Sequence, residues 1–298
     1  MAVSTESSSI SSDFPFESRY VDVLGSRMHY IEEGEGDPIV FLHGNPMSSY
    51  LWRNILPHLA DQGRCIAPDL IGMGKSDKPD IAYRYDDQYR YLSAFLEQMD
   101  LGDNVTIVLH DWGSGLGFRW AHEHKERIKG LAFMEAMVRP LTWDFIPGPQ
   151  RMAIRMMRFA PMGFLMSSVG NIFVKKMIPD MIHRELPAEV KAAYAEPYPT
   201  VASRKAITQW PRELPIDNKP ADNAVHVNGF TDWLQTSDVP KLLFTASPGA
   251  AITEVEAEWC REHLPNLEVV DIGDGLHFIQ EDNPHLIGET ISGWYDRL

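Results

Sequence analysis

Short apolar segments recur along the chain and alternate with segments that have helical spacing. The apolar segments cover residues 39–42, 65–67, 105–109, 128–134, 242–246 and 267–272. The segments with helical spacing cover residues 48–59, 88–99, 116–124 and 253–263. Continuous apolar runs of this length are typical of strands that are buried on both faces. The alternation therefore predicts a parallel sheet with helices packed on both sides.

Two parts of the chain depart from this alternation. Residues 19–23 and 28–32 flank a Gly-Ser pair, which predicts an antiparallel hairpin at the edge of the sheet. After Met134 the alternation stops, and it resumes only near Lys241. The long segment between them is a candidate insertion into the α/β domain.

This candidate insertion is rich in methionine. Nine of the chain's 14 methionines lie at positions 134, 137, 152, 156, 157, 162, 166, 177 and 181. Methionine fills irregular apolar space and adapts its shape. Two compatible interpretations stay open, namely ordinary contacts between a helical lid and its base, or an adaptable apolar wall of a pocket.

Composition narrows the class of protein. A length of 298 residues permits one large α/β domain with an insertion, since single α/β domains commonly reach roughly 250 residues. The formal net charge of −15 disfavours nucleic acid and anionic membrane surfaces as partners and suits a small neutral substrate. The only two cysteines, Cys65 and Cys260, exclude a disulfide framework, and we expect two reduced thiols.

The N-terminus has neither a basic region nor an apolar signal segment, which predicts a cytoplasmic protein without a membrane partner. Its serine-rich residues 1–13 are typical of a disordered leader.

The densest chemical signal is the segment 105–115, a predicted buried strand that turns into a helix. This is the setting of a nucleophile elbow, in which a sharp turn presents the nucleophile at the carboxyl edge of the sheet. Here Asp111 replaces the usual serine. Because the unperturbed pKa of aspartate is about 3.9, Asp111 is ionised at neutral pH and can attack carbon to form an ester. Displacement at a saturated carbon, in an alkyl halide or an epoxide, is then favoured over acyl transfer. The alternative is that Asp111 only caps the following helix.

Two residues near other strand ends support a catalytic role for Asp111. His277 lies in a loop after the apolar run 267–272 and is the candidate general base. Glu135 directly follows the run 128–134, at the edge where catalytic groups of open α/β sheets collect, and is the candidate acid that orients the histidine. The loop after residues 242–246 offers no carboxylate, which also favours Glu135. The alternative for Glu135 is an exposed loop carboxylate.

A third feature is the turn His43-Gly44-Asn45-Pro46, which can aim a backbone N–H group at the elbow. The side-chain amide of Asn45 and the indole N–H of Trp112 are neutral donors. Two such donors in an apolar cavity form a site for a small anion, such as a departing chloride, bromide or iodide. For Trp112 the alternative is core packing.

On these residues the chain resembles the haloalkane dehalogenases of the α/β-hydrolase superfamily. The resemblance is to the branch in which the catalytic acid follows the sixth strand and the asparagine of the HGNP turn binds the halide. It runs from about Tyr20 to the C-terminus. The matching stretches are residues 43–46, 68–76, 110–113, 133–135 and 276–284.

This resemblance implies an α/β-hydrolase fold, with a mostly parallel eight-stranded sheet flanked by helices and an inserted helical cap. It implies a main domain of residues 14–137 and 216–298 and a cap of residues 138–215. The expected reaction is hydrolysis of a carbon–halogen bond in a small halogenated aliphatic substrate, giving an alcohol, a halide ion and a proton. No metal or organic cofactor is expected, and the protein is expected to be a monomer or a homodimer.

Carried over by position, the resemblance implies Asp111 as nucleophile, His277 as base and Glu135 as acid, with Asn45 and Trp112 as halide ligands. These are the same five residues that the residue-based analysis selects. Two further residues, Phe173 and Pro211, match pocket positions of relatives. The first half of the cap, including residues 151–164, departs from the sequence pattern of the haloalkane dehalogenases. The resemblance therefore does not define the shape of the pocket.

Three alternatives stay open. The first is an epoxide hydrolase, which uses the same aspartate and histidine but protonates the ring oxygen of the epoxide, usually with tyrosines of the cap. Tyr194 and Tyr198 are candidates for this role. Asn45 argues against it, because its amide donor suits a halide better than an alkoxide that needs a proton. A coelenterazine-type luciferase is the second, because marine luciferases resemble this branch, and light emission would distinguish it. A catalytically dead ligand receptor with this fold is the third, and the intact set of catalytic residues argues against it.

Overall fold

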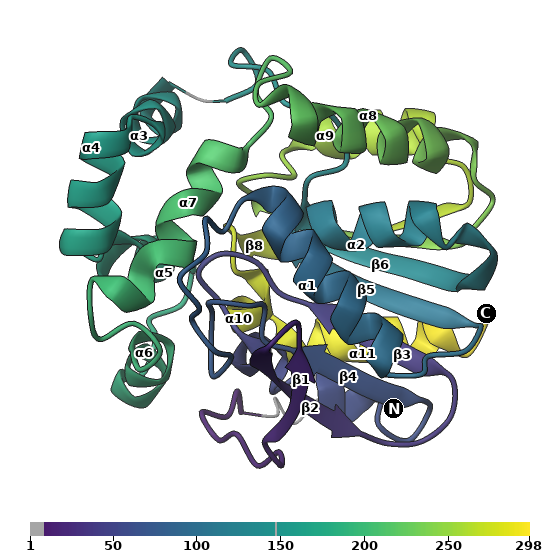
Figure 1. Cartoon of the computed structure of the whole chain (residues 1–298). Coiled ribbons are helices and arrows are strands. Elements are labelled where there is room, and N and C mark those ends of the chain that lie inside the picture. The colour runs from purple at the N-terminus through teal and green to yellow at the C-terminus, as the bar shows by residue number, and fades with distance from the viewer. Residues whose placement is uncertain (1–8, 147) are drawn as a thin grey trace.

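The computed structural model describes residues 9–146 and 148–298. Its centre is an eight-stranded sheet with the order β1-β2-β4-β3-β5-β6-β7-β8 (Figure 1). The strands are β1 Arg19–Val23, β2 Ser26–Glu33, β3 Pro38–Leu42, β4 Arg64–Pro68, β5 Val105–Asp111, β6 Ile128–Ala136, β7 Lys241–Pro248 and β8 Leu267–Gly275. Only the pairings of β2 with β1 and with β4 are antiparallel. The predicted mostly parallel sheet and its edge hairpin are both confirmed.

Alternate residues of the central strands point to opposite faces of the sheet. In β3, Val40 and Leu42 belong to one buried cluster, whereas Ile39 and Phe41 belong to another. The first cluster packs under the helices α1 Tyr85–Gln98, α2 Trp112–Glu123, α8 Ala221–Thr236 and α9 Glu254–His263. The second packs under the helices α10 Ile279–Asp282 and α11 Pro284–Tyr295. The continuous apolar strands thus reflect burial on both faces, as predicted.

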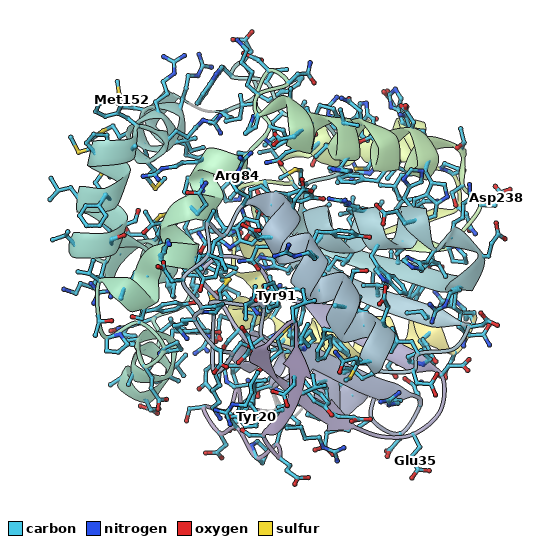
Figure 2. All side chains as sticks on the ribbon, in the orientation of Figure 1. Tyr20, Glu35, Arg84, Tyr91, Met152 and Asp238 are labelled. Carbon is cyan, nitrogen blue, oxygen red and sulfur yellow. The ribbon has the colours of Figure 1, made fainter. Side chains whose placement is uncertain are left out.

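The chain between β6 and α8 folds into a set of helices that lies beyond the ends of the strands (Figure 1). They are α3 Gly148–Arg158, α4 Ala160–Gly163, α5 Ile178–Asp180, α6 Ala188–Ala195 and α7 Lys205–Glu213, with π-helical segments at Phe164–Val169 and Phe173–Met177. Met152 on α3 and Asp238, just before β7, lie at opposite edges of the molecule (Figure 2). No helix among the described residues is long and apolar enough to cross a membrane.

The segment 48–59, with its predicted helical spacing, forms two short 3₁₀ turns, Ser49–Trp52 and Leu56–His58. Proline has no N–H group, so Pro57 cannot make the hydrogen bond that a continuous α-helix requires there. The apolar residues of this segment are still buried against the sheet.

The predicted leader, residues 1–13, is only partly covered, because residues 1–8 lie outside the described residues. Its remaining part is bound to the domain and differs from the disorder expected there. The backbone N–H of Ser11 donates to Asn54 Oδ1 at 3.0 Å, and the hydroxyl of Tyr50 donates to the Ser12 carbonyl at 2.6 Å. The backbone of these serines thus has partners on the main domain.

Candidate active site

Asp111 lies at the sharp turn between β5 and α2. Its φ of 48° and ψ of −128° fall in a region that non-glycine residues rarely adopt, which marks a strained turn. Two glycines make room for it. A Cβ atom on Gly44 would lie 2.0 Å from Asp111 Oδ1, and one on Gly113 would lie 2.2 Å from the Leu42 carbonyl oxygen. The Asp111 side chain makes no capping hydrogen bond to α2, so the helix-cap alternative finds no support.

His277 connects the carboxylate groups of Asp111 and Glu135. Its Nε2 lies 3.3 Å from Asp111 Oδ2, and its Nδ1 lies 3.0 Å from Glu135 Oε2. The loop that carries it follows β8, as the sequence predicts. The His277 carbonyl accepts a hydrogen bond from His110 Nε2 at 2.9 Å, and the His277 N–H donates to the Met181 carbonyl at 3.1 Å. The ring is therefore fixed through its own backbone as well as through its two carboxylate partners.

Glu135 is buried at the end of β6, with a φ of 45°. Backbone N–H groups of the loop after β7 donate to its carboxylate. The N–H of Ala251 donates at 2.6 Å, and those of Ala250 and Ile252 donate at 3.1 to 3.3 Å. The sequence analysis identified this loop only by its lack of a carboxylate and missed its role as donor. The signal was the Pro-Gly pair at residues 248–249, which is typical of a turn. Gly249 has a φ of 67°, and a Cβ atom on it would lie 3.1 Å from Glu135 Oε1.

The charges of these groups are interdependent. Burial by itself lowers the pKa of His277, but the hydrogen bonds and negative charges of Asp111 and Glu135 outweigh burial and raise it to about 10. Burial by itself raises the pKa of Asp111, but the hydrogen bond and charge of His277 outweigh it and lower that pKa. The unliganded site therefore holds an imidazolium ion between two carboxylates at neutral pH.

Asn45 and Trp112, the two residues with candidate N–H donors for a halide, lie close to Asp111. The backbone N–H of Asn45 donates to Asp111 Oδ1 at 2.6 Å. The side-chain Nδ2 of Asn45 makes only a long hydrogen bond of 3.4 Å, to the Ile207 carbonyl. Trp112 is buried, and its ring stacks on Trp210 with centroids 4.4 Å apart. Asn45 and Trp112 both line the cavity above Asp111, so the sequence-predicted anion donors lie beside the predicted nucleophile.

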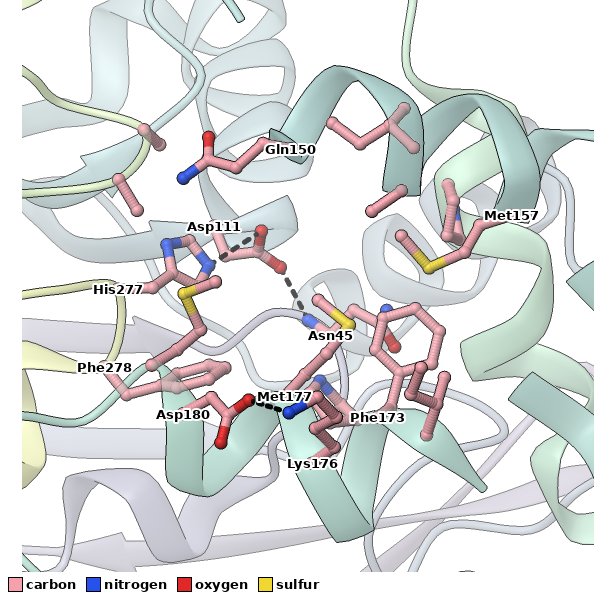
Figure 3. A pocket seen from close by; sticks show the side chains of 18 of the residues that line it. Asn45, Asp111, Gln150, Met157, Phe173, Lys176, Met177, Asp180, His277 and Phe278 are labelled. Atoms are coloured by element: carbon pink, nitrogen blue, oxygen red, sulfur yellow. Dashed lines mark hydrogen bonds and ion pairs between the residues drawn. The ribbon is translucent and has the colours of Figure 1, made fainter. Parts of the chain in front are cut away.

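The cavity has a volume of about 380 Å³ and is lined mainly by apolar side chains of the helical insertion (Figure 3). The lining includes Phe173 and Pro211, the two residues that match pocket positions of relatives. Four of the nine methionines singled out in the sequence also line it: Met157, Met166, Met177 and Met181. Both interpretations of the methionines apply, because these four face the cavity and one of them, Met157, also packs in the buried core.

The cap tyrosines proposed for an epoxide hydrolase do not lie in this cavity. The hydroxyl of Tyr194 donates to Glu281, and the hydroxyl of Tyr198 donates to the Pro46 carbonyl at 2.9 Å. Neither side chain is part of the cavity lining. The structure thus contradicts the expectation that these tyrosines are available to protonate a ring oxygen.

Comparison with known proteins gives concordant matches. Residues 37–168 match the family described as alpha/beta hydrolase fold. A haloalkane dehalogenase of Sphingobium indicum is 44% identical over 95% of this chain and 97% of its own length. One of Mycolicibacterium smegmatis is 41% identical over 93% of this chain and 90% of its own length.

Solved structures agree. The crystal structure of a haloalkane dehalogenase from Bradyrhizobium elkani has a TM-score of 0.91 at 41% identity and covers 95% of this chain and 98% of its own. That of a haloalkane dehalogenase from Agrobacterium tumefaciens has a TM-score of 0.89 at 38% identity and covers 94% of this chain and 96% of its own.

Proposed function

Because the chain belongs to the haloalkane dehalogenase family of the α/β-hydrolase fold, we propose that Asp111, His277 and Glu135 carry out its hydrolysis of carbon–halogen bonds. One observation carries the assignment of the nucleophile. The Asp111 carboxylate lies at the base of an apolar cavity, 2.6 Å from the Asn45 N–H and 3.3 Å from His277 Nε2. An ionised carboxylate there has room to attack only a small apolar molecule.

In the first step, an oxygen of Asp111 attacks the carbon that bears the halogen, in line with the carbon–halogen bond. A carbon–oxygen bond forms, the carbon–halogen bond breaks, and the halide leaves with the bonding electrons. The side-chain N–H groups of Asn45 and Trp112 donate to the halide as its negative charge develops. The apolar lining leaves few competing partners for that charge, and the product is an alkyl ester of Asp111.

Esterification changes the charge of the site. Asp111 becomes neutral, so His277 loses one of the two carboxylates that raise its pKa. The pKa of the imidazole falls, and His277 releases a proton. The neutral ring then accepts a proton from a water molecule, while Glu135 stabilises the imidazolium that forms. The proton that His277 releases after esterification of Asp111 is the proton that the overall reaction produces.

In the second step, the activated water attacks the carbonyl carbon of the ester. The backbone N–H groups of Asn45 and Trp112 hold the tetrahedral oxyanion. The bond between the carbonyl carbon and the alkoxy oxygen breaks, and the alcohol leaves with the proton from His277. The carboxylic acid that forms at Asp111 passes its proton to the neutral His277, which restores the ion pair of the two groups, and halide and alcohol leave the cavity.

The cavity supports a small halogenated aliphatic substrate. Its volume of about 380 Å³ is at the small end for ligand pockets, which typically measure about 300–1,000 Å³. The four methionines in the lining favour tolerance of substrates with different chain lengths, because methionine adapts to the shape of its neighbours.

We assign the main domain to residues 14–137 and 216–298 and the cap to residues 138–215.

The test is a single-turnover measurement on two variants. We expect His277→Gln to release about one halide ion per protein molecule and to gain the mass of the alkyl group at Asp111. We expect Asp111→Ala to release no halide and to gain no mass. Repeated turnover by either variant would contradict the assignment. Light emission from coelenterazine by the wild-type protein, without halide release from a panel of chlorinated, brominated and iodinated alkanes, would favour the luciferase alternative instead.

A further inference from the structure

The outer surface of the cap between Arg151 and Lys176 has an unusual distribution of polar and apolar residues. Every exposed residue in this stretch is apolar, glycine or positively charged. The polar residues Ser167, Ser168 and Asn171 are instead buried. A surface that faces only water normally has the opposite distribution, because buried polar groups need partners that water would otherwise supply.

The exposed apolar residues of this stretch are large, and we call them the cap patch: Met152, Met156, Phe159, Phe164, Leu165 and Val169. Phe159 is 64% exposed, Met152 62% and Leu165 56%. The patch extends over α3, α4 and the π-helical segment Phe164–Val169, and these three elements contact one another. Met152 points away from the molecule at its outer edge (Figure 2). Contiguous exposed apolar surface on a domain typically marks an interaction site.

The charge of the same segment is opposite to that of the rest of the chain. Residues 145–179 contain three arginines, two lysines and no acidic residue. Taking these five from the chain's 27 basic residues leaves 22, against all 42 acidic residues, so the remainder has a formal charge of −20. Arg155 and Lys175 are exposed in the same segment, whereas Lys176 forms an ion pair with Asp180 at 2.7 Å. Arg158 is not available, because it donates to the carbonyls of Pro211 and Leu214.

We propose that the cap patch docks on an anionic lipid surface. Exposed phenylalanine, leucine and methionine side chains insert at the boundary between head groups and acyl chains, and neighbouring cations bind the lipid phosphates. A symmetric contact between two copies fits less well, because it would place the positively charged segment against itself. The net charge of −15 predicts repulsion from such a surface, but residues 138–215 contain 11 basic and 6 acidic residues, so the cap itself has a formal charge of +5.

The cap patch and the cavity lie on two sides of the same helices. Met156 and Leu165 face outward, whereas Met157 and Met166 line the cavity. Lys176 lines the cavity and its side chain is 69% exposed, so the cavity reaches the surface of the cap at this residue. Docking would thus bring to the lipid surface the outer side of the helices whose inner side lines the cavity. Haloalkanes dissolve in lipid, so a docked protein would take its substrate from that phase.

Sedimentation with vesicles tests the proposal. We expect the wild-type protein to bind vesicles that contain phosphatidylcholine and phosphatidylglycerol, to bind phosphatidylcholine vesicles more weakly, and to lose binding at high salt. We expect the double variant Phe159→Ser/Leu165→Ser, and separately Arg155→Gln/Lys175→Gln, to weaken binding on the order of tenfold. Val255→Ser on α9 is the matched control, because Val255 is 62% exposed outside the cap and its substitution should leave binding unchanged.

The variants must keep wild-type halide release in vesicle-free buffer, which shows that they are folded, and none of the substituted residues lines the cavity. Absence of binding to anionic vesicles would overturn the proposal. So would wild-type binding by both cap variants. A concentration-dependent dimer that Phe159→Ser/Leu165→Ser abolishes would identify the cap patch as a contact between copies and would also overturn it.

Discussion

Nε2 of His277 lies 3.3 Å from Oδ2 of Asp111, so the base of the second step is also the counter-ion of the nucleophile of the first. The pKa of each group therefore depends on the charge of the other. Substitution of either residue changes the protonation of its partner as well as the chemistry.

The first prediction concerns the titration of His277. We expect its ring to titrate near pH 10 in the wild-type protein and at a clearly lower pH in Asp111→Asn, because the amide removes one of the two negative charges that raise the pKa of His277. NMR titration of the histidine rings measures both values. A wild-type pKa near the ordinary 6.5 would contradict the ion pair.

The same shift has a consequence for stability. A folded-state pKa above the unfolded value stabilises the protein fully below about pH 6.5, and this contribution is lost as the pH rises towards 10. We expect the wild-type protein to lose more of its free energy of unfolding than Asp111→Asn between pH 7 and pH 10. Urea unfolding at a series of pH values measures the difference, and parallel curves would contradict the prediction.

The second prediction concerns Glu135. We expect Glu135→Gln to slow hydrolysis of the ester by about 10²-fold or more, because the imidazolium loses its counter-charge, while halide release in the first turnover is affected less. Quench experiments that count ester per protein molecule separate the two steps. Equal slowing of both steps would indicate that the substitution disturbs the whole site instead.

The third prediction concerns the halide donors. We expect Trp112→Phe to slow the halide burst by about 10²-fold, since it removes one N–H donor from the developing charge. Trp210→Phe is the matched control, because Trp210 stacks on Trp112 but its own Nε1 donates to Met73 Sδ at 3.5 Å. If both variants slow the burst equally, packing rather than donation explains the effect.

The fourth prediction concerns Gly44. We expect Gly44→Ala to abolish measurable halide release, because the new Cβ would lie 2.0 Å from Asp111 Oδ1 and would displace the carboxylate. Gly293→Ala on α11 is the control, since a Cβ there meets nothing within 4 Å and alanine favours a helix. Activity of Gly44→Ala close to that of the control would show that the elbow tolerates a shift of Asp111.

The fifth prediction concerns a buried ion pair close to the site. The carboxylate of Glu281 accepts two hydrogen bonds from Arg53, at 2.5 and 2.9 Å, and one from Arg184 at 2.6 Å. We expect Glu281→Gln to lower the free energy of unfolding by about 3–5 kcal/mol, because it leaves the Arg53 charge buried and uncompensated. Glu268→Gln breaks an exposed pair with Arg297 and should cost at most about 1 kcal/mol. Urea unfolding compares the two variants, and equal losses would contradict the argument.

Much of the fold and site could be predicted from the sequence, because strands buried on both faces are continuous apolar runs and catalytic groups follow their carboxyl ends. Asp111, Glu135 and His277 were all identified in this way. The N–H groups that hold Glu135 could not be identified, since backbone donors have no residue type. The positions of Tyr194 and Tyr198 depend on tertiary packing of the cap, which a local pattern does not record. The oligomeric state and the cytoplasmic location stay predictions.

The Met181 carbonyl, which accepts the N–H groups of both His277 and Phe278, joins the cap directly to the loop that carries the proposed base. Met181 also lines the cavity, so one residue of the cap bears both on the pocket wall and on the position of His277. An insertion or deletion of one residue near Met181 is therefore expected to change the fit of the substrate and the activation of water together.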